Sequence, residues 1–117
     1  MATSVEAQFQ KMEVEELRRD YAWEALLAEA FDGKVALALD PGCSSQPFAL
    51  ENVTQVLGVK SFDEDGLTED ALLRLDDGRF AYVSGFVDGG GARAVFALEL
   101  STLLDYLGPK LKAAFGL

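Results

Sequence analysis

Carboxylates are the side chains of this sequence whose spacing comes closest to a chemical site. Paired acids can act as general acid and base in hydrolases, and oxygen ligands bind divalent cations. Seven acids and one base, Arg74, fall between residues 63 and 77. With Gly66 placed at the sixth position of an EF-hand loop, the first and twelfth positions would hold Ser61 and Leu72. Neither supplies the required carboxylate, so no metal site is predicted.

The same acidic run is instead the first candidate for binding a partner protein. The predicted partner-binding residues are Asp63, Glu64, Asp65, Glu69, Asp70, Asp76 and Asp77. Clustered negative charge attracts basic surfaces. The alternative is that these acids only keep the protein in solution.

Other catalytic chemistry is excluded by counts of residues. The chain has no histidine and one cysteine, Cys43, so Ser-His-Asp triads, Cys-His pairs and zinc sites cannot be built. Three consecutive glycines at 89–91 match no phosphate-binding motif and are typical of a hairpin tip. We therefore expect a protein that is not an enzyme and that needs no cofactor.

The composition predicts one acidic domain spanning residues 1–117. Twenty acidic and ten basic residues give a net charge of −10, which disfavours direct binding to nucleic acid and favours a partner with a basic surface. The sequence has no apolar stretch of the roughly 20 residues that a membrane span needs. It also begins without a secretory signal and can form no internal disulfide, so a cytoplasmic location is expected.

The N-terminal third is predicted to be a long helix. Thr3 and Glu6 have capping-box spacing, residues 13–31 are good helix formers, and Gly33 is a suitable terminator. Whether the helix is broken near residues 10–12 stays open. At helical spacing this segment has one broad apolar face. A second apolar stripe, on nearly the opposite side of the helix, is formed by Trp23, Leu26 and Ala30. This stripe either packs under the C-terminal helix or forms an oligomer interface, which would make the protein a homodimer.

The remaining elements predict an α+β fold. Residues 34–39 indicate a strand, and residues 48–59 are ambiguous, with a short helix preferred over a strand. Runs at 71–75, 79–87 and 92–100, separated by turn residues, predict an antiparallel meander. A helix at 102–107 ends at Gly108, and Pro109 starts a last turn. The expected fold is a small antiparallel sheet, made of this late three-stranded meander plus one earlier strand, covered by a long N-terminal helix and a C-terminal helix.

Two classes of binding protein resemble this chain in general character. In size, acidity and lack of catalytic residues it is similar to small phage-encoded inhibitors of host defence, including anti-CRISPR and anti-restriction proteins. That resemblance implies an inhibitor that occupies a basic groove of its target, in the host cytoplasm. The alternative is a dedicated partner protein, such as a toxin immunity protein or a type III secretion chaperone, which is similar in being a short acidic α+β dimer. The order of strands read here differs from the chaperone pattern.

Overall fold

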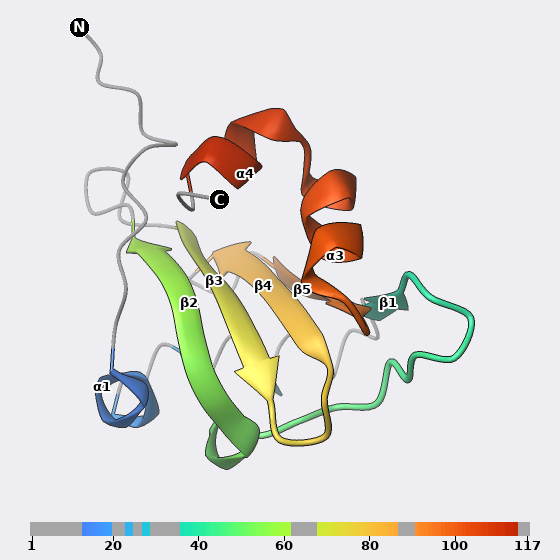
Figure 1. Ribbon diagram of the computed structural model, residues 1–117. Coiled ribbons are helices and arrows are strands. Elements are labelled where there is room, and N and C mark those ends of the chain that lie inside the picture. Colours follow the sequence, from blue (N-terminus) through green and yellow to red (C-terminus); the bar gives the residue numbers. More distant parts are fainter. Residues whose placement is uncertain are drawn as a thin grey trace, which may run out of the picture.

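The structure is a computed structural model, and it describes residues 13–19, 23–24, 27–28, 36–61, 68–86 and 91–114. Its centre is a five-stranded mixed sheet with the strand order β1-β5-β4-β3-β2 (Figure 1). The strands are β1 (Ala36–Ala38), β2 (Val53–Ser61), β3 (Thr68–Leu75), β4 (Phe80–Phe86) and β5 (Gly91–Ala97). Strands β2 to β5 form an antiparallel meander, and β1 lies parallel to β5 at one edge. The fold class is therefore α+β, as the sequence predicts.

The hairpin turn between β3 and β4 shows why the meander forms where the sequence places it. Gly78 in this turn has a φ of 94°, a left-handed conformation that glycine adopts without steric cost. On both sides of the turn, apolar side chains alternate between the two faces of the sheet. Asp76 and Asp77 begin the turn, so the prediction of a hairpin here is confirmed.

The prediction of a short helix over residues 48–59 is wrong. Only one turn of 3-10 helix, η2 (Leu50–Asn52), forms in this range, and Val53 then begins the nine-residue strand β2. The meander consequently has four strands instead of three. β-branched residues in this segment pack well on a half-buried sheet surface, and that packing prevails over the helical spacing of its apolar residues.

The long N-terminal helix is also not matched. The helix α1 (Val14–Arg18) has five residues and is followed by Arg19 as its C-cap. Residues 23, 24, 27 and 28 again have helical backbone, whereas Thr3, Glu6 and Gly33 lie outside the described residues. Helix propensity is a weak preference that tertiary contacts override.

The two helices at the C-terminus agree better with expectation. The helix α3 (Leu100–Leu107) begins two residues before the predicted range and ends at Gly108, which has a φ of 97°. Pro109 opens α4 (Pro109–Ala114), as predicted. Among the described residues, no helix is long and apolar enough to span a membrane.

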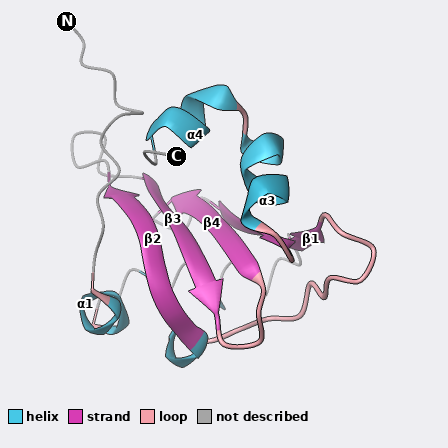
Figure 2. Ribbon diagram, in the orientation of Figure 1, coloured by secondary structure: helices cyan, strands magenta, loops and turns pink. Residues whose placement is uncertain are grey.

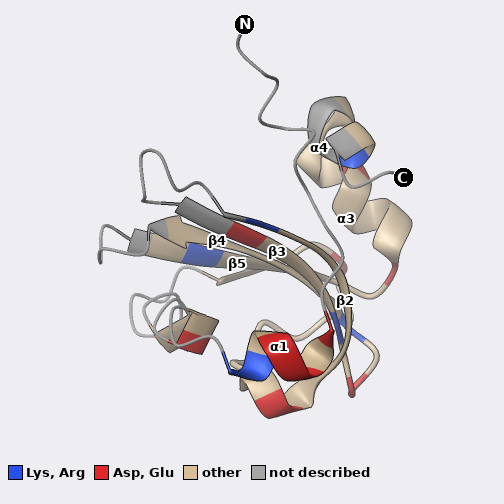
Figure 3. Cartoon of the chain, turned by 90° about the vertical axis from the view of Figure 1, so that its left-hand side faces the viewer, with Lys and Arg blue, Asp and Glu red and all other residues tan. Residues whose placement is uncertain are grey.

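Helices lie on both sides of the sheet (Figure 3). On one side, α1 and the helical residues 23–24 and 27–28 cover one face, and on the other side α3 packs on β4 and β5. The buried side chains accordingly form two clusters. The first contains Leu17, Trp23, Leu27, Phe48, Leu50, Val53, Val56, Val59, Ala71, Leu73, Leu75, Ala81, Val83, Ala94 and Phe96. The second, under α3, contains Leu72, Tyr82, Val95, Ala97, Leu103 and Leu104.

Candidate functional site

The described acids of the run at 63–77 do not form one continuous surface. Residues 63–65 lie outside the described residues, Glu69 and Asp70 lie in β3, and Asp76 and Asp77 lie in the turn after it. A strand rises about 3.3 Å per residue, so the six steps from Asp70 to Asp76 separate them by roughly 20 Å along the sheet. The described acids of this run are therefore divided between a strand and the turn that follows it.

Asp70 is engaged in a polar cluster within the sheet. Its Oδ2 accepts a hydrogen bond of 2.7 Å from the Tyr82 hydroxyl, and its Oδ1 accepts one of 3.0 Å from the Ser84 hydroxyl. The strand register places Lys60 beside Asp70 and Arg93 beside Ser84, so polar residues cross four strands in one row. Asp70 is thus committed to the fold and is a poor candidate for contact with a partner.

Tyr82 gives this cluster a testable pH dependence. Burial, and after it the negative charge of Asp70, raises the pKa of the Tyr82 phenol well above its usual 10.0. An unfolded tyrosine loses its proton near pH 10, whereas the folded one keeps it, so the stability that Tyr82 contributes is complete below pH 10 and is lost as the pH rises further. We expect Tyr82→Phe to cost about 1–3 kcal/mol at neutral pH, because it removes a hydrogen bond to a charged acceptor. The variant should also show a shallower fall of stability in alkali than the wild type. Urea unfolding across this pH range measures both effects, and parallel profiles for the two proteins would contradict them.

Asp77 also makes its contacts within the protein's own fold. Its Oδ2 lies 2.9 Å from Nε of Arg79, a side chain that is buried among the loop and sheet residues. The Arg79 guanidinium also donates to the backbone oxygens of Ser44 and Gln46, at 2.9 and 3.0 Å, and lies 4.4 Å from the centre of the Phe96 ring. These contacts fasten the long loop between β1 and η2, drawn in pink in Figure 2, to the β3–β4 hairpin. Asp77 orients the arginine that makes them.

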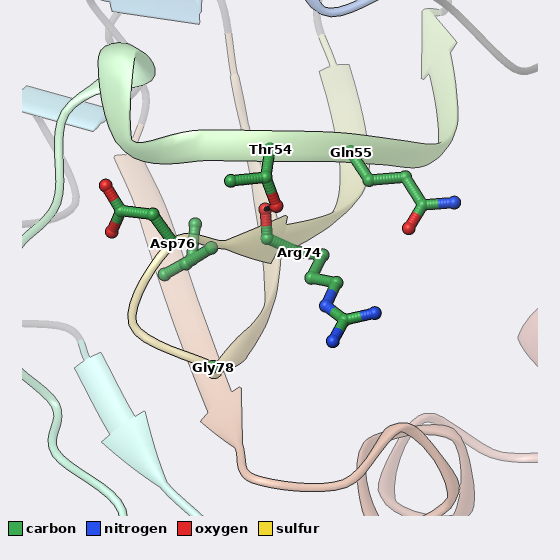
Figure 4. Close-up of a pocket in the computed structure, with 6 residues that line it drawn as sticks. Thr54, Gln55, Arg74, Asp76 and Gly78 are labelled. Atoms are coloured by element: carbon green, nitrogen blue, oxygen red, sulfur yellow. Dashed lines mark hydrogen bonds between the residues drawn. The ribbon is translucent and has the colours of Figure 1, made fainter.

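Asp76 remains exposed, next to a shallow hollow of about 400 Å³ at the hairpin end of the sheet (Figure 4). Its carboxylate accepts a hydrogen bond of 3.1 Å from the Asn52 side chain, which ties the turn to η2. Arg74 and Gln55 extend from neighbouring strands on another side of this hollow, and Asp76 points away from both. The Arg74 guanidinium lies 5.5 Å from the centre of the Phe80 ring, a cation–π contact that accounts for its position.

Trp23, one of the three interface residues predicted on the N-terminal helix, is placed differently from either expectation. Trp23 is 1% exposed and belongs to the core cluster on the α1 side of the sheet, opposite the face that α3 covers. It therefore packs within its own chain, and it does not lie under the C-terminal helix. Leu26 and Ala30 lie outside the described residues. The structure thus gives a homodimer through Trp23 no support.

Exposed acids from separate parts of the sequence gather on α1 and on the helical turns beside it (Figure 3). Arg18 connects these elements, because its guanidinium, which pairs with Glu15, also donates to the backbone oxygens of Glu51 and Val53 at 3.3 and 3.4 Å. The hydrogen bond between Asn52 and Asp76 brings in the β3–β4 turn. We call this region the α1–η2 acidic surface, and its residues are Glu15, Glu16, Glu24, Glu51 and Asp76. Only Asp76 belongs to the run that the sequence singles out.

No group of three or more histidine, cysteine or acidic side chains among the described residues is arranged to hold a metal ion. Cys43 is half-buried, and burial raises the pKa of its thiol, which makes it less reactive as a nucleophile.

Comparison with known proteins adds no further constraint. No family model matches the chain, and no significant match is found among the curated proteins or the solved structures.

Proposed function

We propose that this protein is a non-enzymatic binding protein that inhibits a target by occupying a basic groove on its surface. The observation that supports the proposal is the α1–η2 acidic surface, where four separate segments bring exposed carboxylates to one end of the molecule. The target is a protein with a basic surface, and we expect the interaction to take place in the cytoplasm. An acidic inhibitor encoded by a phage against a defence protein of its host would have this character.

Electrostatics would act mainly on the rate at which the two proteins meet. Negative charge on one partner and positive charge on the other accelerate association and suppress wrong partners. Salt screens this long-range attraction, because the Debye length falls to about 8 Å at physiological ionic strength. A partner bound in this way should therefore associate more slowly as salt is raised.

The test is a reversal of charge on the surface without a change in the fold. We expect Glu15→Lys with Asp76→Lys to weaken partner binding at least tenfold, which is about 1.4 kcal/mol. Both side chains are exposed, so the ion pair of Glu15 with Arg18 and the hydrogen bond of Asp76 contribute little to stability. Affinity capture from lysate of the source organism or its host, with mass spectrometry, identifies the partner, and association kinetics at two salt concentrations then measure the effect.

A matched control carries the same change of charge elsewhere. Glu99 and Asp105 are exposed on the α3 side of the sheet, and Glu99→Lys with Asp105→Lys should leave partner binding within about twofold of wild type. Equal losses in the two double variants would mean that only net charge matters. Unchanged affinity and salt-independent kinetics in the first variant would refute the proposal and leave the acids a role in solubility alone.

A further inference from the structure

A second hollow of about 290 Å³ lies beside the α1–η2 acidic surface. Glu24, Leu27 and Ala28 form one wall and residues 48–51 form the other. Leu27, Phe48 and Leu50 are buried side chains that line it. Ala28 and Ala49 are exposed lining residues, and their small side chains leave the space open.

The wall formed by residues 48–51 is held by contacts within the fold. The Phe48 ring packs edge-on against Phe96 of β5, with ring centres 5.9 Å apart. The backbone N–H of Ala49 donates to the Asn52 side chain at 2.9 Å, which fixes the chain as it enters η2. A hollow whose walls are fixed in the free protein saves the ordering cost of binding.

Two carboxylates complete the lining, from Glu24 on one wall and Glu51 on the other. Both residues are exposed, and neither carboxylate has a hydrogen bond or ion pair with another described residue. The nearby Arg18 guanidinium is directed to Glu15 and to backbone oxygens of Glu51 and Val53, and does not pair with the Glu51 carboxylate. An apolar hollow flanked by two acids is complementary to a group that is aliphatic along its length and positively charged at its end.

We propose that this hollow binds one lysine or arginine side chain of the partner protein. The aliphatic stem lies against Leu27, Phe48 and Leu50, and the charged head reaches Glu24 and Glu51. Long basic side chains cover apolar surface in this way while they keep their charge near solvent. A purely apolar group would remove water from two carboxylates without pairing them, which costs free energy. The inference rests on the proposed function for the source of the side chain, and it adds an anchor that positions the partner.

The test uses n-butylammonium as a probe, because it reproduces the lysine side chain beyond Cα. We expect it to shift the NMR signals of Leu27, Ala28, Ala49 and Leu50 in a saturable manner. Methylammonium, which has the charge without the stem, and 1-butanol, which has the stem without the charge, should each bind at least fivefold more weakly. Equal binding of either analogue would overturn the proposal, as would shifts that occur only at other signals.

Two sets of variants test the carboxylates and the apolar hollow separately. Glu24→Gln with Glu51→Gln should weaken n-butylammonium binding about fivefold, whereas Glu99→Gln with Asp105→Gln makes the same change of charge on the α3 side and should have no effect. Ala49→Phe fills the hollow without a change of charge and should abolish the saturable shifts. Its backbone is extended, with φ −108° and ψ 164°, so phenylalanine fits there without strain. Retained binding in Ala49→Phe, with an unchanged circular dichroism spectrum, would also overturn the proposal.

The anchor and the proposed function can fail separately. If n-butylammonium does not bind but reversal of Glu15 and Asp76 weakens the partner, the acidic surface has its proposed role and the anchor is wrong. If n-butylammonium binds as expected but charge reversal leaves the partner unaffected, the hollow takes aliphatic cations and the proposed function is wrong.

Discussion

Replacement of Trp23 with alanine should lower the free energy of unfolding by about 3–5 kcal/mol, the usual range for removing a large aromatic side chain from a core. Trp23 is almost completely buried and lies in one cluster with Leu17 and Leu27 under the sheet. Its loss leaves a cavity among the core side chains that α1, Leu27 and the strands contribute. Because Trp23 is the only tryptophan, urea unfolding should be followed by circular dichroism instead of fluorescence.

Tyr106 provides the control, since it is an aromatic residue that is 46% exposed on α3. Tyr106→Ala should cost less than about 1 kcal/mol. The unfolding midpoint of the wild type should not depend on protein concentration, because Trp23 packs within one chain. A midpoint that rises with concentration, together with a small effect of Trp23→Ala in dilute solution, would place Trp23 between two chains and restore the homodimer alternative.

The late part of the chain could be predicted because its signals are local. Alternation of apolar residues and the turn at Asp76-Asp77-Gly78 define β3 and β4 without knowledge of the rest of the fold. Gly108 and Pro109 mark the boundary between α3 and α4 in the same way. The prediction for residues 48–59 fails because the spacing of their apolar residues fits both a helix and a strand. Only pairing with the neighbouring strand β3 decides between the two.

The candidate site could not be predicted, because nothing in the sequence connects its members. Glu15, Glu51 and Asp76 are far apart in the sequence, and contacts made by Arg18 and Asn52 bring their elements together. Conversely, the acids that are adjacent in sequence are separated by the extended geometry of β3. In a loop, residues that are close in sequence often share one surface. In a strand, the extended backbone places successive side chains on opposite faces and spreads them along the length of the sheet.

Arg79→Met should lower the free energy of unfolding by about 2–4 kcal/mol, although arginine is rarely a core residue. The Arg79 side chain is 6% exposed, and its guanidinium stacks on Phe96 while it donates to Asp77 and to two loop oxygens. Methionine keeps much of the volume and removes every one of these hydrogen bonds. The Asp77 side chain is 49% exposed, so water can solvate it after the change, and the loss should fall below that of a fully buried ion pair.

Two further variants separate the contribution of the buried guanidinium from that of charge. Arg74→Met removes the same charge from an exposed position on the neighbouring strand and should cost less than about 1 kcal/mol. Asp77→Asn retains Arg79 and should cost about 1 kcal/mol, with partner binding unchanged, because Asp77 serves the fold. Urea unfolding measures all three variants, and hydrogen exchange at residues 43–46 should increase most in Arg79→Met as the loop loses its attachment. Equal costs for Arg74→Met and Arg79→Met would show that the loop is held without the guanidinium, and Asp77 would then be free to join the α1–η2 acidic surface.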